Sequence, residues 1–580
     1  MLLVPIMGKV RSVILFLASP SVATPLSLIA AGLICWGEED LRSLPFLFFV
    51  FLALLGASLL LTQRLSASLC ASLGLLLTIS AVSHMKLDFM GMSLYAYDTY
   101  FYQRDLEIYR FLWDTYLDPI WPALGIGIGG TILFLLAWRY EPRLYLARVY
   151  AAIILILASA GLPLSYPHSA NHAGYYFKGH RATSFFTSIK PAAAVASEMS
   201  LYKGLVSDPS AGIYTGTHRC RPDNRPDIVI TLMESAMPPS LFGLKVGPEL
   251  ERAFAPTGAV HALQTETFGG GTWISTVGLM TSLATTGFGW ARPYLPIYLQ
   301  GRVHHSLPQY LKSCGYRSAV ISPLTYNFVN EGAFLSSLGV DDYIDYTALK
   351  APSKHERDDV YFDAALHYIQ ARHRISDQPL LVFVMTMATH GPYREPFLPH
   401  VAVAGAPFGN SPESDEYLRR LTIQQRDFAG FIAALRSAST PHGALVLEFG
   451  DHQPSVTPSL ISRLGATPLN DPDSLAYRTY YRVTAVGTSI VQAPPSLPLL
   501  DIAYLAPTVL QAAGLPLDDV YSQLVALRDR CNGAFARCKD QAAIRRHLSR
   551  LINAGMLDLG VAADRPPAEH VSEPAGDHRS

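Results

Sequence analysis

Four short stretches in the C-terminal half of the chain carry side chains that could do chemistry together. They are residues 228–235 (IVITLMES), 269–282 (GGGTWISTVGLMTS), 385–393 (MTMATHGPY) and 445–455 (LVLEFGDHQPS). The first and last are apolar runs that stop abruptly on Glu234 and on the Asp451–His452 pair. In an open α/β sheet, strands end in this way where ligands bind. The pattern predicts one metal-centred site for phosphoryl transfer.

The metal ligands expected from these stretches are Glu234, Asp451 and His452. Neighbouring side chains leave a strand in opposite directions, so Asp451 and His452 can face one ion only where the strand has turned, and Gly450 permits such a turn. Two oxygens and a nitrogen suit one divalent ion, Zn²⁺ or Mn²⁺. Taken alone, Glu234 could equally cap the helix that follows its strand.

Thr272 follows three glycines and begins a stretch that looks helical. Such a hydroxyl can be a helix N-cap. It can also be a nucleophile that is activated as a metal ligand, at a helix terminus whose N–H groups stabilise phosphate oxygens. No Gly-x-Gly-x-x-Gly or P-loop pattern is present, so the glycines do not indicate nucleotide binding.

His390 ends another apolar run and precedes Gly391-Pro392-Tyr393. A histidine in this place can stabilise charge on a phosphate or protonate a leaving alkoxide. A single histidine after a strand can also be purely structural, and the residues alone leave both interpretations open.

The elements that must position these residues follow from the same pattern. Buried parallel strands are expected at 227–233, 318–322, 380–387 and 444–449, with helices at 308–314, 417–436 and 501–514. This alternation indicates a mostly parallel sheet covered on both faces. We therefore expect an α/β catalytic domain over residues 224–560, followed by a polar, proline-rich and disordered tail over 561–580.

The N-terminal residues 1–166 read as a transmembrane domain of five helices. Each apolar segment approaches the roughly 17–25 residues that span a bilayer, at 12–36, 44–61, 65–82, 120–138 and 149–166. Basic residues before the first segment and in the second and fourth connections place the N-terminus in the cytoplasm and the catalytic domain outside it. Residues 167–223 are expected to be a juxtamembrane linker, with an interfacial helix at 185–205.

In this order and at these intervals, the four motifs resemble the alkaline phosphatase/sulfatase superfamily. They resemble most its membrane-anchored branch of lipoteichoic acid synthases, periplasmic-glucan phosphoglycerol transferases and lipid A phosphoethanolamine transferases. The resemblance implies that Glu234, Thr272, Asp451 and His452 bind the metal, that Thr272 is the nucleophile and that His390 contacts substrate. The chain departs from the synthases at Asn330-Glu331, where they have Asn-Arg and the arginine contacts the phosphoglycerol. It lacks the Cys-x-Pro-x-Arg motif of true sulfatases.

The resemblance implies transfer of a phospholipid headgroup through phospho-threonine to a hydroxyl of a periplasmic or extracellular glycan or glycolipid. The expected donor is phosphatidylglycerol first and phosphatidylethanolamine second, at the bacterial inner membrane. The alternatives are a phosphodiesterase or phosphatase with water as acceptor, and a non-catalytic membrane sensor. A net charge of −1 gives no indication of nucleic-acid binding. If the C-terminal part lies outside the cytoplasm, its cysteines could pair as Cys531–Cys538 and Cys220–Cys314, or stay as buried thiols.

Overall fold

The four strands expected from apolar runs lie side by side in the middle of one eight-stranded sheet, whose order is β4-β3-β5-β1-β6-β7-β2-β8. The structure is a computed structural model. It describes residues 20–559, apart from 39–40, 91–92, 103–116, 168–179, 190–207, 217–219, 221–224, 245, 256–259, 408–410, 439, 458–470 and 472. The strands are β1 (Asp227–Met233), β2 (Val260–Gln264), β3 (Arg317–Ser322), β4 (Asp342–Asp345), β5 (Leu380–Met385), β6 (Ala444–Gly450), β7 (Arg478–Val486) and β8 (Leu500–Asp501).

The sheet is mixed and mostly parallel, as expected. β1 pairs in parallel with β5 on one side and with β6 on the other, so Met233 lies level with Gly450. Only β7 runs antiparallel to its neighbours β6 and β2. The carboxyl ends of β1 and β6 therefore meet at the same edge, which brings Glu234 next to Asp451 and His452.

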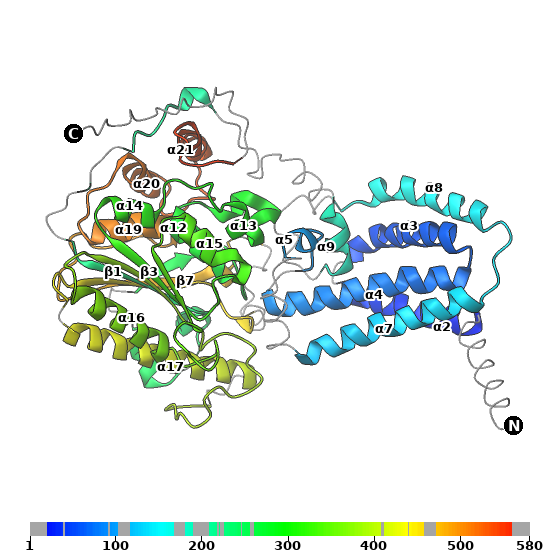
Figure 1. The fold of residues 1–580 in the computed structure, drawn as a ribbon, viewed down its shortest axis with the longest axis horizontal. Coiled ribbons are helices and arrows are strands. Elements are labelled where there is room, and N and C mark those ends of the chain that lie inside the picture. The colour runs from blue at the N-terminus through cyan, green and yellow to red at the C-terminus, as the bar shows by residue number, and fades with distance from the viewer. Residues whose placement is uncertain are drawn as a thin grey trace, which may run out of the picture.

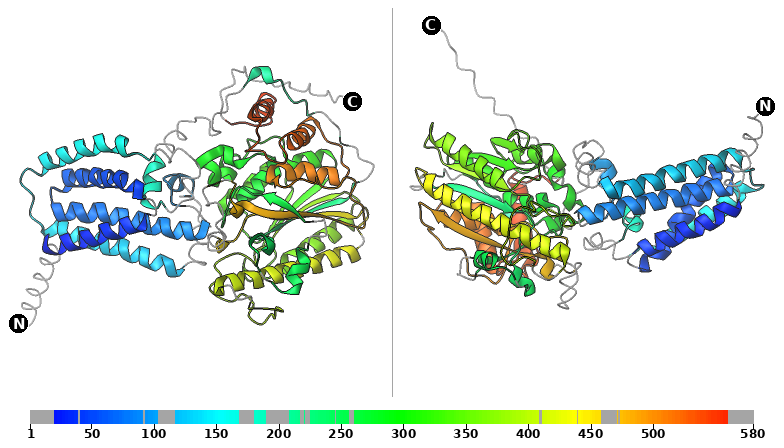
Figure 2. Two further views of the ribbon diagram at one scale, coloured as in Figure 1. Left: turned by 180° about the vertical axis from the view of Figure 1, so that it is seen from behind. Right: turned by 90° about the horizontal axis from the view of Figure 1, so that it is seen from below.

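Helices cover both faces of the sheet (Figures 1 and 2). Along β1, Ile228, Ile230 and Leu232 enter one apolar core while Val229 and Met233 enter the other. The first core includes residues of α12 (Thr272–Thr281), α13 (Leu295–Tyr298), α14 (Leu307–Ser313), α15 (Glu331–Ser337), α19 (Leu505–Ala512), α20 (Asp519–Arg530) and α21 (Gln541–Asn553). The second includes residues of α11 (Pro248–Ala253), α16 (Asp359–His373) and α17 (Pro412–Ala438).

The N-terminal half forms an elongated helix bundle beside the sheet domain (Figure 1). Its long helices are α2 (Pro20–Gly37), α3 (Leu44–Thr62), α4 (Leu65–Met90), α7 (Leu117–Tyr140) and α8 (Ala147–Ser165), at the five places expected. Among the described residues, three stretches are long and apolar enough to cross a membrane: Leu41–Thr62, Leu65–Leu87 and Ala147–Ser165. This indicates membrane anchoring, while the count of five crossings stays a prediction.

Two short helices, α5 (Asp98–Phe101) and α9 (Ala182–Thr187), lie between the bundle and the sheet domain (Figures 1 and 2). The start of the predicted interfacial helix at 185–205 falls in α9, and its remainder from residue 190 lies outside the described residues. The same holds for the predicted tail and for residues 12–19 of the first predicted span.

Two disulfides join the four cysteines that follow the helix bundle. Cys220 pairs with Cys314, and Cys531 pairs with Cys538. Both pairings were among the sequence alternatives, and the buried-thiol alternative is wrong. The two free cysteines, Cys35 and Cys70, lie in the helix bundle.

Candidate active site

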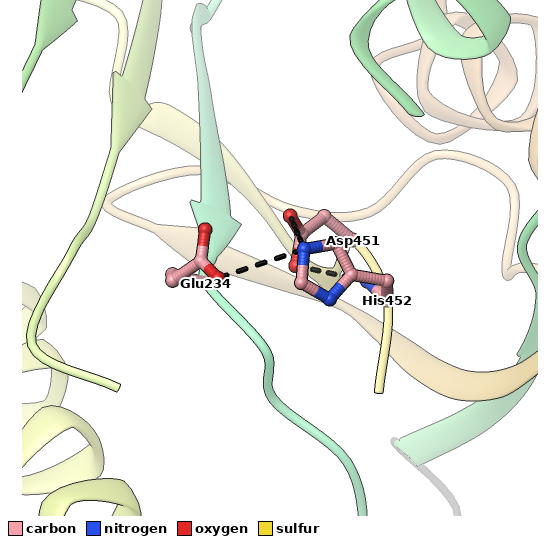
Figure 3. A group of neighbouring side chains, drawn as sticks. All are labelled: Glu234, Asp451 and His452. Atoms are coloured by element: carbon pink, nitrogen blue, oxygen red, sulfur yellow. Dashed lines mark hydrogen bonds and ion pairs between the residues drawn. The ribbon is translucent and has the colours of Figure 1, made fainter. Parts of the chain in front are cut away.

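The structure brings Glu234, Asp451 and His452 together at the carboxyl ends of β1 and β6 (Figure 3). One ligand atom from each lies within 4.8 Å of the others, and all three side chains are buried. Nε2 of His452 is 3.3 Å from Oδ2 of Asp451 and 3.6 Å from Oε1 of Glu234. The ligand set expected from sequence is therefore one cluster in space.

The donor set fits a divalent cation on two structural observations. Oδ2 of Asp451 is buried and has no hydrogen-bond partner among the described residues, whereas Oδ1 accepts from the N–H groups of Ser235 and His452. Nδ1 of His452 lies 3.0 Å from the carbonyl of Gln453. An Nδ1–H donated to that carbonyl leaves the Nε2 lone pair directed at the two carboxylates, as is usual for a metal-binding histidine.

Electrostatics at the cluster also favour a bound cation. Burial and the neighbouring charge of Glu234 raise the pKa of Asp451 to about 7. Burial alone would lower the pKa of His452, but the charges of Asp451 and Glu234 raise it overall. Two carboxylates buried next to each other repel one another, and a divalent ion relieves that repulsion.

Thr272 lies against this cluster at the start of α12. Its hydroxyl donates to Oε2 of Glu234 at 3.1 Å and lies 3.5 Å from Nε2 of His452. Gly271 occupies the N-cap position with φ 77°, a conformation that favours glycine. The alternative that Thr272 is the N-cap is therefore wrong, because Gly271 takes that position. Thr272 is the first residue of α12, and its hydroxyl contacts the acidic cluster.

Several hydrogen bonds hold the backbone of Glu234 in place directly after β1. Its N–H donates to the Thr386 hydroxyl at 2.9 Å, and its carbonyl accepts from Thr389 and from Gln424. The next residue, Ser235, has φ 51°, which is uncommon for a residue with a side chain. Its hydroxyl donates to Oε1 of Glu234 at 2.7 Å. A constrained backbone of this kind fixes the carboxylate in place.

His390 lies in the loop after β5 and lines the same pocket as Glu234 and Thr272. Its Nδ1 is 2.6 Å from the Gly391 carbonyl. Burial lowers the pKa of His390, which favours the neutral imidazole. The structure thus brings His390 to the site, and its chemical role stays a prediction.

Sequence reasoning missed the residues that hold this loop. Oδ1 of Asp358 accepts from the N–H groups of Met387 and Ala388, and Arg420 donates to the carbonyl of His390 at 2.8 Å. His355 packs beside His390 with ring centroids 6.3 Å apart, and burial lowers its pKa to about 3. The sequence offers one signal, the acidic Asp358 in RDDVYF directly before α16. An acidic residue in that position can equally be a helix N-cap.

Glu266 and Thr267, to which the sequence assigned no role, support the loops around α12. Glu266 accepts from the Thr285 N–H and from the hydroxyls of Thr285 and Thr286. Thr267 donates to the Gly270 carbonyl at 2.5 Å. Glu331, which stands where the resembling synthases have arginine, is buried, and burial raises its pKa to about 7. It is not among the residues that line the described pocket.

Comparisons with known proteins add three findings. Residues 226–515 match the family model described as Sulfatase. A protein of Haemophilus influenzae described as uncharacterized is 25% identical over 321 residues, covering 52% of this chain and 55% of that protein. The chain thus spans about half the length of this curated relative.

Solved structures with a similar fold include a phosphoglycerol transferase, GacH, of Streptococcus pyogenes in complex with sn-glycerol-1-phosphate (16% identity, 58% of this chain and 87% of that chain, TM-score 0.45). Another is the lipoteichoic acid synthase LtaP of Listeria monocytogenes (16% identity, 54% and 77%, TM-score 0.41). A third is the integral membrane lipooligosaccharide phosphoethanolamine transferase A of Neisseria meningitidis (13% identity, 86% and 97%, TM-score 0.45).

Proposed function

This chain belongs to the sulfatase family, and from that premise we propose that it is a membrane-anchored, metal-dependent phosphotransferase. It takes the phosphorylated headgroup of a phospholipid and passes it to a hydroxyl of a glycan or glycolipid outside the cytoplasm. Phosphoglycerol is the preferred headgroup and phosphoethanolamine the second. The catalytic domain spans residues 224–560 and the membrane domain residues 1–166.

The single observation that carries this proposal is the position of the Thr272 hydroxyl. It contacts Glu234 at 3.1 Å and lies 3.5 Å from His452 at the beginning of a helix. A hydroxyl held at an acidic metal-ligand cluster is suited to nucleophilic attack, whereas a binding module has no need of both a nucleophile and ligands. The first N–H groups of α12 are in addition suited to hold phosphate oxygens.

Glu234, Thr272, Asp451 and His452 would hold one divalent ion, Zn²⁺ or Mn²⁺. When bound, the ion would lower the pKa of the Thr272 hydroxyl and offset negative charge on the phosphoryl group. Ser235, Gln453 and Gln424 keep the ligands in position through the bonds described above. Catalysis is then mostly positioning and charge neutralisation.

In the first half-reaction the Thr272 oxygen attacks phosphorus, and the bond from phosphorus to the diacylglycerol oxygen breaks. The headgroup phosphate remains on Thr272, and the departing oxygen takes up a proton equivalent to the one that Thr272 loses. In the second half-reaction an acceptor hydroxyl attacks the same phosphorus and restores Thr272. We assign the proton movement to His390, whose neutral imidazole can accept a proton from one oxygen and return it to another.

The proposal is tested by incubating the full chain with headgroup-labelled phosphatidylglycerol or phosphatidylethanolamine and mapping the label by mass spectrometry. We expect label on Thr272 and release of diacylglycerol. Thr272→Ala should lose transfer by on the order of 10³-fold or more, while Thr272→Ser keeps part of it. Thr281→Ala, at the other end of α12, is the matched control and should transfer normally.

The outcome of this experiment also separates the alternatives. Transfer that persists in Thr272→Ala would mean that water or another side chain attacks, and the phospho-threonine mechanism would have to be withdrawn. Release of free headgroup phosphate by the unaltered chain, with acceptor present, would indicate hydrolysis instead of transfer.

A further inference from the structure

A pocket of about 320 Å³ lies next to Thr272, between the helix bundle and the sheet domain. Its polar lining includes Glu234, Thr272 and His390. The apolar lining comes from both halves of the chain: Val82, Met85 and Leu94 from the bundle side, and Trp273, Leu324 and Phe328 from the sheet domain. The site therefore has a wall that belongs to the membrane domain.

The bundle side of the pocket belongs to a helix with the properties of a membrane span. Val82 and Met85 lie on α4, within the stretch Leu65–Leu87 that is long and apolar enough to cross a bilayer. One pocket thus touches both the candidate nucleophile and a membrane-crossing helix. A substrate that has a phosphate at one end and a hydrocarbon part at the other matches this distribution.

The segment around Asp98 is joined to α4 by a buried ion pair. Nζ of Lys86 is 2.8 Å from both carboxylate oxygens of Asp98, and lies over the Tyr95 ring at 4.5 Å. Asp98 also accepts from the Tyr95 N–H at 2.7 Å. Since a buried charge is costly without its partner, this pair fixes the segment relative to α4.

The same segment is joined to the sheet domain. The Tyr294 hydroxyl donates to Asp98 at 2.8 Å, and the Tyr294 ring stacks on Phe101 with centroids 4.7 Å apart. The carbonyl of Pro293 accepts from both the Tyr102 hydroxyl at 3.0 Å and Nε1 of Trp273 at 2.8 Å. Trp273 follows Thr272 directly, so these contacts connect the membrane-side wall to the nucleophile helix.

We propose that this pocket binds the acyl-glycerol portion of the phospholipid donor, and that Asp98 and Tyr294 are positioning residues that hold its membrane-side wall against the catalytic domain. The inference rests on the proposed function, which does not say where the hydrocarbon part of the donor lies. At about 320 Å³ the pocket is at the lower end of the roughly 300–1,000 Å³ of ligand sites. It therefore takes the glycerol and the beginning of the acyl chains, and the rest of the chains stays in the bilayer.

The lining argues against the acceptor sugar as the occupant. Lys86 and Asp98 also line the pocket, but they are paired with each other. Sugar hydroxyls buried against Met85, Leu94 and Phe328 would lack hydrogen-bond partners, at a cost of about 1–3 kcal/mol each. The lipid part of a glycolipid acceptor could pack against this apolar lining without losing hydrogen bonds. The test therefore measures the donor half-reaction by itself.

The test compares donors that differ only in their acyl chains. The full chain in detergent is given dioleoyl phosphatidylglycerol or glycerophosphoglycerol, and in parallel the two ethanolamine counterparts, without acceptor. Labelling of Thr272 gives kcat/KM for each donor, and the ratio of lipid to deacylated donor is the readout. Met85→Trp fills the pocket and should lower this ratio at least about tenfold, the effect of losing one or two buried methylene groups.

Leu75→Trp is the matched control, because Leu75 lies on the same helix and is 46% exposed. It should leave the ratio unchanged. A ratio that is equally unchanged in Met85→Trp would overturn the inference. So would an effect of Met85→Trp confined to transfer onto a glycolipid, since the pocket would then serve the acceptor.

A second measurement needs no variant. A phospholipid with a photoreactive group near the start of its acyl chain is cross-linked to the unaltered chain, and peptides are identified by mass spectrometry. We expect adducts on Trp273, Leu324 or Phe328, which belong to the sheet domain and are not part of a membrane helix. Adducts confined to α3, α7 and α8 would contradict the proposal.

The positioning role is tested with Tyr294→Phe, which removes the hydrogen bond to Asp98. We expect KM for the lipid donor to rise about fivefold, as for loss of one buried hydrogen bond, while kcat stays within about twofold. An unchanged KM would remove Tyr294 from this role. If the unaltered chain labels Thr272 from neither donor type, the proposed function fails, and the cross-linking result still decides what the pocket binds.

Discussion

At the scale of single residues, Asp451 makes the strongest case for a metal ion. Its carboxylate is buried, Oδ1 accepts two N–H groups, and Oδ2 has no hydrogen bond among the described residues and lies 3.3 Å from Nε2 of His452. Leaving a charged oxygen buried and unpaired costs several kcal/mol. A cation between Asp451, Glu234 and His452 satisfies that oxygen, and explains why two carboxylates are buried next to each other.

We therefore expect one divalent ion per chain, bound through this cluster. Asp451→Asn or His452→Ala should weaken metal binding by ~100-fold or more. Even residues that only hydrogen-bond to a metal ligand change metal affinity by about 10–100-fold. The fold should persist, because a single ion adds little to so large a core. Elemental analysis of purified protein checks this, with the exposed His442→Ala as control. A full equivalent of metal in His452→Ala would remove that residue from the site.

His373 provides a pH-dependent contribution to stability away from the site. Its Nε2 is 2.6 Å from Oδ2 of Asp227, the first residue of β1, and this bond raises the pKa of His373. Because the pKa is higher in the folded chain, the contribution is full below the unfolded value of about 6.5, and is lost as pH rises through the folded value. His373→Gln should lower Tm more at pH 5.5 than at pH 9.

Thermal unfolding in detergent, followed by circular dichroism, measures this difference. His367→Gln is the control, since His367 is exposed on the same helix and its Nδ1 contacts only a carbonyl of its own turn among the bonds described. A Tm difference for His373→Gln that grows with pH would show that the imidazole is not stabilised as a cation.

At the scale of elements, the end of β6 depends on a residue without a side chain. A Cβ placed on Gly450 would lie 2.0 Å from the carbonyl oxygen of Ala236, in the backbone that follows β1. The two strand ends can approach closely only because this atom is missing. That approach places Asp451 next to Glu234, so Gly450 sets the geometry of the ligand cluster. Gly450 is the last residue of β6 and is not among the residues with positive φ, so the structure requires glycine here for the close approach and not for the turn expected from the sequence.

Gly450→Ala should consequently destabilise the domain by about 1–3 kcal/mol or more, since backbone must move to admit the methyl group. It should also weaken metal binding. Gly430→Ala is the matched control: it lies in α17 with nothing within 4 Å of an added Cβ, and should stabilise by roughly 0.5–1 kcal/mol. Denaturant unfolding and metal analysis measure both effects. A neutral Gly450→Ala would mean that the two strand ends separate at little cost.

The elements differ in how far sequence could predict them, for physical reasons. β1, β5 and β6 are buried on both faces, so their sequences are apolar runs that predict buried strands. The candidate ligands follow β1 and β6 directly, so the same runs also indicated the ligands. β7 (RTYYRVTAV) carries two arginines, and β4 (DYID) is short, acidic and only partly buried at the sheet edge. β4 has no pattern that distinguishes a strand. The Thr, Tyr and Val residues of β7 favour a strand, but they do not form the uninterrupted apolar run by which the central strands were identified. Contacts such as Asp358 with Met387, or Tyr294 with Asp98, join distant positions and exist only in the folded chain.

At the scale of the whole molecule, the distribution of cysteines agrees with a chain divided between two environments. The two disulfides lie in the sheet domain and the residues just before it, and both free cysteines lie in the helix bundle. Disulfides persist in oxidising compartments outside the cytoplasm. The pocket that joins the two parts of the chain places the candidate nucleophile close to the bundle, as the proposed function requires.

The basic residues of the bundle predict its orientation in the membrane, and this prediction can be tested directly. Arg139, Arg143 and Arg148 gather at the connection between α7 and α8, and such clusters stay in the cytoplasm. With the five crossings predicted from the sequence, we expect the residues after α8 to lie outside. In a Cys35→Ser/Cys70→Ser background, a membrane-impermeant maleimide added to intact cells should label Ser210→Cys and leave Tyr145→Cys unlabelled until the cells are opened. Both positions are exposed, so access is decided by the membrane and not by packing. Labelling of Tyr145→Cys from outside would reverse the orientation, and would place the Thr272 site on the cytoplasmic face, where neither an extracytoplasmic acceptor nor the two disulfides would fit.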